Sequence, residues 1–343
     1  MKTVPFIRYF LQAAREQRRA EDAVLSLLPS LLDTKYIRKE EPSGKSVHYL
    51  KKNFFSILFL SVYAALHIPK EKRIFYGIIN HCLRGLVTGT DNLLDNEYKE
   101  MLPLNFAQGA TRFKSVMHIL LFDRVLFAAV NEMVNHQVIS PSQSSTLHDA
   151  LFSALVPIGA EEAMEEGGVT EILRPDAILK SVHMYKGGKL LCLAFVAPLV
   201  LETDKTEMLQ QADRGIYSIG LALQVIDDLT DFYDDIRDQR HNYLLSVVYH
   251  EGNADERNAL VRFLENRNNT SPAIEKQYKD SVKIVMERAI GEAVKGFDLL
   301  ASAGYWLERK SALRIIRQLF RLRGVKNLLP FFPADKEIKQ TLT

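Results

Sequence analysis

The sequence predicts an all-α protein, and three features of the residue pattern lead to that prediction. Apolar side chains recur at the 3.6-residue period of amphipathic helices in almost every segment. No segment shows a convincing alternation of apolar and polar side chains, which a half-buried strand would require. Prolines and polar residues separate segments of helical length. We therefore expect a single large helical bundle, whose natural ligand site is a central cavity between facing helices.

The helices predicted in the first half of the chain are separated mainly by prolines. The first helix is expected to end near Pro29, and Pro69 separates the second from the third. Pro103 closely follows the third helix. Ser140 before Pro141 is typical of an N-cap followed by proline at the first helical position. The predicted ranges are 5–28, 47–67, 70–96, 106–135 and 141–166.

The second half continues with long and short helical segments. Their predicted ranges are 175–201, 205–233, 243–251, 254–265, 273–302 and 305–322. The chain shows no composition break, Gly/Ser-rich linker or repeat, so one domain over residues 1–343 is the simplest prediction. The last helix is basic and amphipathic. Such a helix either contacts a membrane surface or, more commonly, packs on the bundle with a solvated basic face.

The composition is that of an ordinary soluble globular protein. Of the 343 residues, 47% are hydrophobic and 25% charged, and the formal charge of +2 gives no nucleic-acid footprint. Cys82 and Cys192 are too few for a disulfide framework and lack zinc-type spacing, which favours a reduced, cytoplasmic protein. The amphipathic start does not resemble a signal peptide. The apolar runs at 54–68 and 190–201 are too short to span a bilayer, so we expect buried helices there.

Five carboxylates fall at helical spacing in the apolar stretch 221–235, which reads LALQVIDDLTDFYDD. In a helix Asp227, Asp231 and Asp235 point from one face, with Asp228 beside them and Gln224 one turn earlier. Like charges at this spacing repel by about 0.2–0.5 kcal/mol per pair on an exposed helix, and more where solvent is excluded. Mg2+ would offset the repulsion, since it prefers a few carboxylate oxygens together with waters and substrate phosphates. The acidic motif at 227–231 therefore predicts half of a magnesium and diphosphate site.

A first acidic motif, at residues 91–95, repeats the same spacing with Asp91 and Asp95. If the two motifs face each other across the bundle, they would hold several Mg2+ ions together with a diphosphate. The ions would neutralise the charge of a diphosphate leaving group, and the carbocation left behind needs an apolar cavity that excludes water. Leu86 and Val87, about one turn before Asp91, are predicted to form the cavity floor. Neither is aromatic, which hints at room for a longer substrate.

A third group of carboxylates also repeats at i, i+4 but is not expected to bind metal. It consists of Glu161, Glu162, Glu165 and Glu166. Two glycines follow the group and no apolar segment leads into it, so we expect an exposed helix end there.

The second motif resembles that of the trans-isoprenyl diphosphate synthases, the polyprenyl synthetase family of class I isoprenoid synthases. In this family Gln precedes a DDxxD sequence by three positions, and Gln224, Asp227, Asp228 and Asp231 match that phrase. The order and spacing of the matching residues extend over about residues 40–250. The resemblance implies an all-α bundle, a homodimer, an allylic prenyl diphosphate substrate and several Mg2+ ions.

The first motif matches the family with one change. Asp91 and Asp95 are present, but Asn92 stands where the family has a second aspartate, and its carbonyl could coordinate without adding charge. The resemblance assigns the metal ions to Asp91, Asp95, Asp227 and Asp231. It gives a catalytic role to these four residues together with Asp228 and Gln224.

The resemblance also assigns the diphosphate contacts. Lys45 matches the lysine of a Gly-Lys loop, and Lys186 in MYKGGKL matches the lysine that contacts the diphosphate, with Lys189 as an alternative. His48 replaces an arginine that the family places three positions after the loop lysine. The family's arginine pair after the first motif is missing. The lysine expected after the second motif is also missing, although Arg237 and Arg240 could reach phosphate there.

Three functions fit these matches and departures. A prenyltransferase would ionise the allylic diphosphate and pass the prenyl group to isopentenyl diphosphate or another acceptor. A terpene synthase on the same scaffold would act on a single prenyl diphosphate, and the missing arginines favour it. A non-catalytic subunit of a heteromeric synthase is the third alternative, which the presence of both acidic motifs disfavours.

Overall fold

The computed structural model describes residues 4–38, 46–95, 97–267 and 271–332. Within these ranges the regular secondary structure is helical, apart from one isolated bridge between Ile37 and Leu104. The prediction of an all-α protein is confirmed. The backbone forms two compact units, which we describe separately: one from Thr3–Leu151 and Leu193–Leu209, the other from Phe152–Cys192 and Gln210–Thr343. A single functional domain over residues 1–343 stays a prediction.

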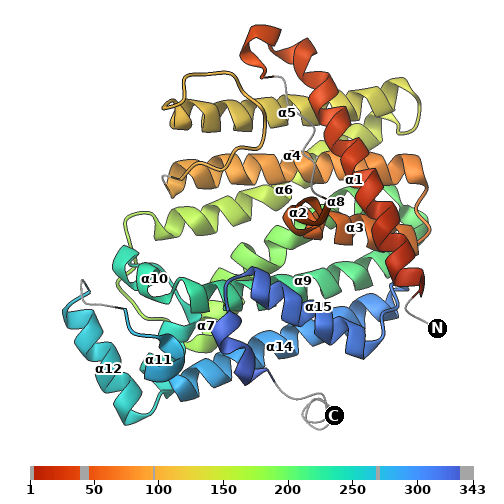
Figure 1. The fold of residues 1–343 in the computed structure, drawn as a ribbon. Helices are drawn as coiled ribbons and strands as arrows, with labels where there is room; N and C mark the ends of the chain where they lie inside the picture. Colours follow the sequence, from red (N-terminus) through yellow and green to blue (C-terminus); the bar gives the residue numbers. More distant parts are fainter. Residues whose placement is uncertain (1–3, 39–45, 96, 268–270, 333–343) are drawn as a thin grey trace. The chain divides into compact units, whose positions relative to one another are not determined.

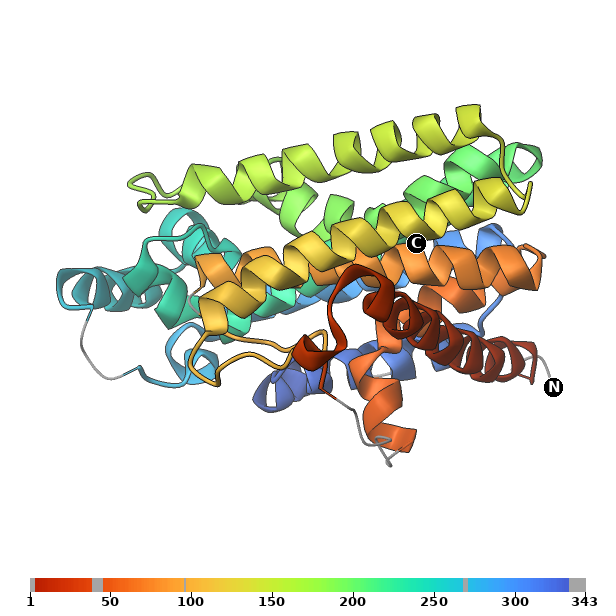
Figure 2. The same cartoon turned by 90° about the horizontal axis from the view of Figure 1, so that it is seen from above.

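The first unit is built around an apolar central helix and a pair of long helices. Helix α3 (Phe54–Ala65) is apolar on all sides and almost wholly buried, and α4 and α5 run side by side (Figures 1 and 2). Helix α1 packs against α3 and α4. The other helices of this unit, with their bounds, are α1 (Val4–Leu31), η1 (Thr34–Tyr36), α2 (Ser46–Lys52), α4 (Lys70–Leu94), α5 (Thr111–Asn135), the first part of α6 (Pro141–Glu165), most of α8 (Leu190–Leu201) and η3 (Thr203–Lys205).

Buried charges in the first unit are paired across helices. Arg73 on α4 donates from Nε to the Glu16 carboxylate on α1 over 2.9 Å, and both side chains are less than one-tenth exposed. Glu202, at the end of α8, accepts hydrogen bonds from Tyr76 and Lys72 of α4. Because a buried charge is costly unless it is paired, these contacts set which faces of α1, α4 and α8 meet.

The second unit carries the second acidic motif. It holds the rest of α6 and α8, α7 (Pro175–Lys180), a π-helix (Met184–Lys189), most of α9 (Thr206–Thr230), α10 (Phe232–Asp238), α11 (Tyr243–Glu251), α12 (Ala254–Glu265), α13 (Ile274–Gln277), α14 (Lys279–Ser302), α15 (Arg309–Leu322) and η4 (Lys326–Phe331). Helix α15 lies beside α14 (Figure 1). The apolar face of α15, including Leu313, Ile316 and Phe320, is buried, which is the packed arrangement expected of a last helix.

Four of the predicted helices are broken, which the sequence pattern did not indicate: those at 47–67, 175–201, 205–233 and 273–302. The helix predicted at 175–201 is interrupted by the π-helix, where Gly187 packs directly against the backbone of α9. A Cβ on Gly187 would lie 2.5 Å from the carbonyl oxygen of Gly220, so only glycine allows this approach. The helix predicted at 205–233 is divided at Asp231, which is the N-cap of α10. Pro29 lies inside α1 and does not end it.

Local capping was predicted more accurately. The Ser140 hydroxyl accepts a hydrogen bond from Gln143 N (3.1 Å), and the Gln143 side chain accepts one from Ser140 N (2.9 Å). This reciprocal pair is a capping box and confirms the predicted start of α6.

The stretch Pro175–Leu201 is long and apolar enough to cross a membrane by length and composition alone. Half of its most apolar window is buried inside the protein.

Candidate active site

The second acidic motif lies where α9 meets α10. Asp227 and Asp228 occupy the last turn of α9, and Asp231 is the N-cap of α10. Asp231 N donates to Asp227 O over 2.9 Å, and Asp235 N donates to Asp231 O over 2.8 Å. These bonds continue the helical register across the break. Asp227, Asp231 and Asp235 therefore keep the one-turn spacing that the sequence predicted.

The carboxylates of this row are electrostatically destabilised. Burial raises the pKa of Asp227 to about 6, and repulsion from Asp231 and Asp228 adds to the effect of burial. Burial and the neighbouring Asp228 raise the pKa of Asp235 to about 8. The pKa of Asp231 is raised by burial and by Asp228 and Asp234. A row of acids that resists ionisation is an environment that a divalent cation would stabilise.

Arg323 supplies a positive charge to this row from the end of α15. Its Nη1 donates to both carboxylate oxygens of Asp227, at 3.0 and 2.9 Å. The positive charge lowers the pKa of Asp227 and so opposes the effect of burial. The sequence placed Arg323 only in the basic C-terminal segment, and no spacing rule connects it with a residue 96 positions earlier.

Asp228 faces inward and anchors the motif. Its carboxylate is hydrogen-bonded to His183 Nε2 (2.9 Å) and accepts from Gln224 Nε2 (3.2 Å) and from the backbone N–H of Tyr243. Asn242 donates to the backbone oxygen of Asp228 (2.7 Å). Because these contacts engage both carboxylate oxygens, Asp228 anchors the motif in the protein. The catalytic role that the resemblance assigns to Asp228 stays a prediction. His183 and Asn242 had no signal in the sequence that linked them to the motif.

Lys186 lies against the third group of carboxylates. Its Nζ is 2.7 Å from Glu165 Oε2 and 3.1 Å from Glu162 Oε2. Burial by itself would lower the pKa of Lys186, but the two carboxylates raise it above its ordinary value, so this lysine stays charged. The expectation of an exposed helix end is wrong for Glu161 and Glu165, which are both buried. Lys186 lies in the π-helix, and its side chain pairs there with the acidic residues of α6.

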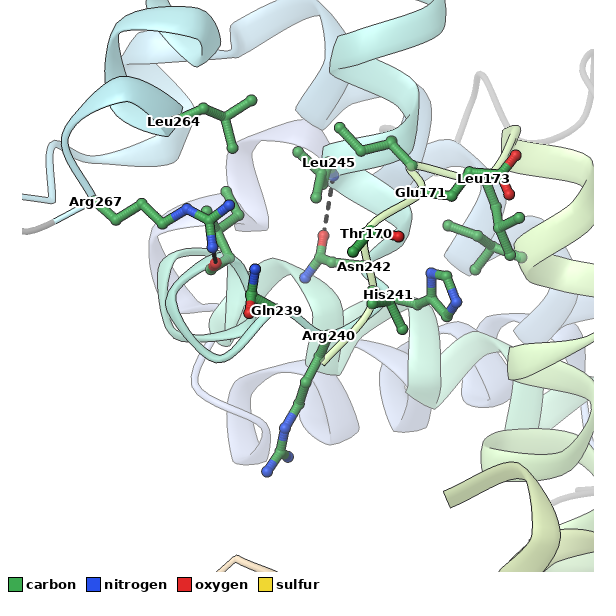
Figure 3. Close-up of a pocket in the computed structure, with 14 residues that line it drawn as sticks. Thr170, Glu171, Leu173, Gln239, Arg240, His241, Asn242, Leu245, Leu264 and Arg267 are labelled. Atoms are coloured by element: carbon green, nitrogen blue, oxygen red, sulfur yellow. Dashed lines mark hydrogen bonds between the residues drawn. The ribbon is translucent and has the colours of Figure 1, made fainter. Parts of the chain in front are cut away.

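The two arginines after the second motif differ in their surroundings. Arg237 donates to Asp234 (2.7 Å), Ser271 Oγ (2.6 Å) and the backbone oxygen of Arg267 (3.1 Å). Arg240 lines a cavity of about 220 Å³ whose wall also includes His241, Asn242 and Arg267. In Figure 3 the Arg240 side chain extends away from Asn242 and Leu245. Arg237 thus holds a loop, while Arg240 sits at the edge of a cavity next to the motif.

The first acidic motif lies at the end of α4, in the first unit. Asp91 is in the last turn and Asp95 is the C-cap residue. Asn92 is buried, its side-chain oxygen accepts from Lys99 N (2.9 Å), and its Nδ2 donates to Lys99 O (3.1 Å). The amide therefore fastens the loop after the motif, and its carbonyl oxygen accepts from the backbone N–H of Lys99. That the two motifs share metal ions stays a prediction.

The remaining predicted residues of the first unit have simple environments. His48 is exposed on α2. Leu86 and Val87 are half-buried on α4, and their role as a cavity floor stays a prediction. Lys45 lies outside the described residues.

The donor set of the second motif fits a magnesium ion that is partly held by its substrate. Among the described residues, no group of three His, Cys, Asp or Glu side chains is arranged to hold a metal by itself. Mg2+ usually takes only one or two protein carboxylates and fills its other positions with waters and phosphates. Asp227 and Asp231, which lie one turn apart and have raised pKa values, meet that requirement.

Comparisons with known proteins bear on the fold. No protein-family model and no curated protein matches this chain. A decaprenyl diphosphate synthase from Rhodobacter capsulatus superposes with a TM-score of 0.59 at 14% identity, covering 91% of this chain and 98% of its own. A geranylgeranyl pyrophosphate synthetase from the archaeon Geoglobus acetivorans gives 0.56 at 16% identity, covering 88% and 98%.

A third solved structure has a ligand bound. It is a polyprenyl synthase from Caulobacter crescentus CB15 complexed with calcium and isoprenyl diphosphate, with a TM-score of 0.52 at 15% identity, covering 94% of this chain and 95% of its own. Identities this low establish only the fold. The chain has the all-α fold of the trans-isoprenyl diphosphate synthases, as the acidic motifs predicted.

Proposed function

We propose that this protein is a Mg2+-dependent class I isoprenoid synthase. It ionises an allylic prenyl diphosphate and transfers the prenyl group to isopentenyl diphosphate or another acceptor. The observation that carries the proposal is the row of Asp227, Asp231 and Asp235, whose pKa values are raised within a fold shared with prenyl diphosphate synthases. The calcium and isoprenyl diphosphate bound to the Caulobacter protein support the same ligand class.

The residues of the chain have separate roles in this proposal. Bound Mg2+ would neutralise the charge that develops on the diphosphate leaving group. Asp91, Asp95, Asp227 and Asp231 supply the carboxylate oxygens that hold it. Asp228 fixes the end of α9 through His183 and Tyr243, so that Asp227 is held in position. Gln224 and the cationic residues Lys45, His48, Lys186, Arg237 and Arg240 are proposed to position the diphosphate.

A terpene synthase is the second candidate, and the environment of Lys186 favours it. A chain-elongating enzyme must bind two diphosphates, which together need many positive charges. Here Lys186 is already paired with Glu162 and Glu165. An enzyme that acts on one prenyl diphosphate needs only the ionising half of such a site.

Product analysis separates these candidates. The protein is incubated with Mg2+ and geranyl, farnesyl or geranylgeranyl diphosphate, each with and without isopentenyl diphosphate. A longer diphosphate supports elongation, whereas a hydrocarbon or alcohol from one diphosphate supports the terpene synthase. No release of diphosphate from any substrate would contradict both and favour a non-catalytic subunit.

A homodimer and a cytoplasmic location are further parts of the proposal. Four apolar side chains of α5 support the dimer because they are at least two-fifths exposed: Phe113, Val116, Leu120 and Phe127. An apolar row of this kind on one helix suits an isologous contact. A peripheral membrane contact through the exposed basic residues of α15 remains a secondary proposal, testable by vesicle co-sedimentation.

A further inference from the structure

Arg323 and Asp227 form the closest link between the C-terminal segment and the second acidic motif. Arg323 Nη1 lies between the two oxygens of the Asp227 carboxylate, at 3.0 and 2.9 Å. The ends of α15 and α9 meet at the same place, since a Cβ on Gly324 would lie 3.5 Å from Thr230 Cγ2. The contact is therefore built into the packing of the second unit.

The guanidinium of Arg323 has unused hydrogen-bonding capacity. An arginine carries five N–H donors. Within the described residues, only Nη1 of Arg323 donates a hydrogen bond. The side chain is 41% exposed and Asp227 is 26% exposed, so a ligand could approach the pair from solvent. Nε and Nη2 form the fork that binds a phosphate or carboxylate with two parallel hydrogen bonds.

The guanidinium of Arg323 contacts both Asp227 oxygens through which a metal ion would bind. A cation on Asp227 requires at least one of the two oxygens that Nη1 now contacts, so Arg323 and metal compete for this carboxylate. Once displaced, the guanidinium would lie close to whatever anion the metal brings. The sequence lacks the arginine pair expected after Asp95, so the chain needs another source of bidentate cationic contacts.

We propose that Arg323 is a substrate-binding residue that pairs with Asp227 in the substrate-free protein and moves to the diphosphate when a metal–diphosphate complex binds. This inference rests on the proposed function, because it assumes that Asp227 holds a divalent ion. The proposal predicts that Arg323 affects two binding equilibria in opposite directions. Arg323 opposes the binding of metal alone but strengthens the binding of metal together with diphosphate.

Binding measurements on three proteins test these opposite effects on metal and pyrophosphate affinity. The proteins are the wild type, Arg323→Gln and the control Arg321→Gln, which removes the same charge from an exposed position on α15. Mn2+ binding is followed by the loss of the free-ion EPR signal. Binding of inorganic pyrophosphate at fixed Mg2+ is followed by calorimetry, and circular dichroism checks folding.

The expected result is opposite shifts in the two assays. Arg323→Gln should bind Mn2+ alone about 3–10-fold more tightly than wild type and bind pyrophosphate with Mg2+ about 10-fold more weakly, the latter a loss of one charge-assisted contact. Arg321→Gln should match wild type in both. If Arg323→Gln and Arg321→Gln bind pyrophosphate equally, the inference is overturned while the proposed function stands. If wild-type protein binds neither Mn2+ nor pyrophosphate, the proposed function itself is overturned.

Discussion

Nε2 of His183 lies 2.9 Å from Oδ2 of Asp228, and the two side chains are only 1% and 3% exposed. This buried contact distinguishes two adjacent aspartates that look equivalent in the sequence. Asp228 is turned into the protein and satisfied by hydrogen bonds, whereas Asp227 faces the end of α15, where its carboxylate is paired with Arg323. The two residues should therefore respond differently to mutation.

Asp227→Ala is expected to abolish turnover while leaving the helical content nearly unchanged. The variant loses a metal-binding carboxylate, and more than about 100-fold in rate should be lost, since even outer-shell partners of metals cost 10–100-fold. It also loses one repulsive charge and one partly exposed ion pair, so the change in folding free energy should be small. Diphosphate release and far-ultraviolet circular dichroism measure the two effects. The control Asp238→Ala removes an exposed aspartate at the end of α10, and equal activity in both variants would contradict the metal assignment.

Asp228→Ala is expected to destabilise the protein. It leaves His183 Nε2 and the N–H of Tyr243 buried without their acceptor, and breaking a buried charged network of this kind costs about 3–5 kcal/mol. Urea denaturation without Mg2+ should show the loss, while Asp227→Ala under the same conditions should not. A free energy of unfolding that is equal in the two variants would mean that Asp228 is not the anchor of the motif.

Lys186→Met is expected to destabilise the second unit because it removes the only positive charge that the described structure pairs with Glu162 and Glu165. The loss should be about 3 kcal/mol, as for other buried ion pairs that lose one partner. The double variant with Glu165→Gln should recover part of it, since one repulsive carboxylate is then gone. A double-mutant cycle measured by urea denaturation tests this, and strictly additive effects would show that the pair is not coupled.

The stability of the first unit is expected to fall as the pH drops below about 6.5. Burial, together with the charges of Arg84 and Lys52, lowers the pKa of His81 from its ordinary 6.5 to about 3. Between these pH values His81 is protonated in the unfolded chain but stays neutral in the folded chain. The contribution of neutral, buried His81 to the free energy of unfolding is therefore complete above pH 6.5. It falls by up to about 1.4 kcal/mol per pH unit as the pH drops toward 3.

Thermal unfolding from pH 7.5 to 4.5 checks this expectation in wild type and two variants. His81→Gln cannot take up the proton, so its melting temperature should fall less steeply with acidification. His136→Gln, which replaces an exposed histidine at the end of α5, should retain the wild-type slope. Parallel slopes in His81→Gln and wild type would show that another group causes the acid sensitivity.

The helical elements could be predicted from the sequence because they depend on local patterns. Ser140, Gln143 and Pro141 start α6 as their spacing indicates, and the apolar period places most helices within a few residues of their observed bounds. The π-helix at Met184–Lys189 could not be predicted, because it depends on Gly187 meeting the backbone of Gly220 more than thirty positions away. The inward turn of Asp228 was equally hidden, since His183 approaches it from another segment.

The 3.6-residue helical period is enough to predict the all-α class and the single-face row of Asp227, Asp231 and Asp235. Which charges meet that row and its neighbours follows from how the helices pack in three dimensions. Arg323 reaches Asp227 and Lys186 reaches Glu165 because of how separate segments pack. The physical reason is that an ion pair depends on distance in space, which local periodicity does not encode for residues far apart in the chain.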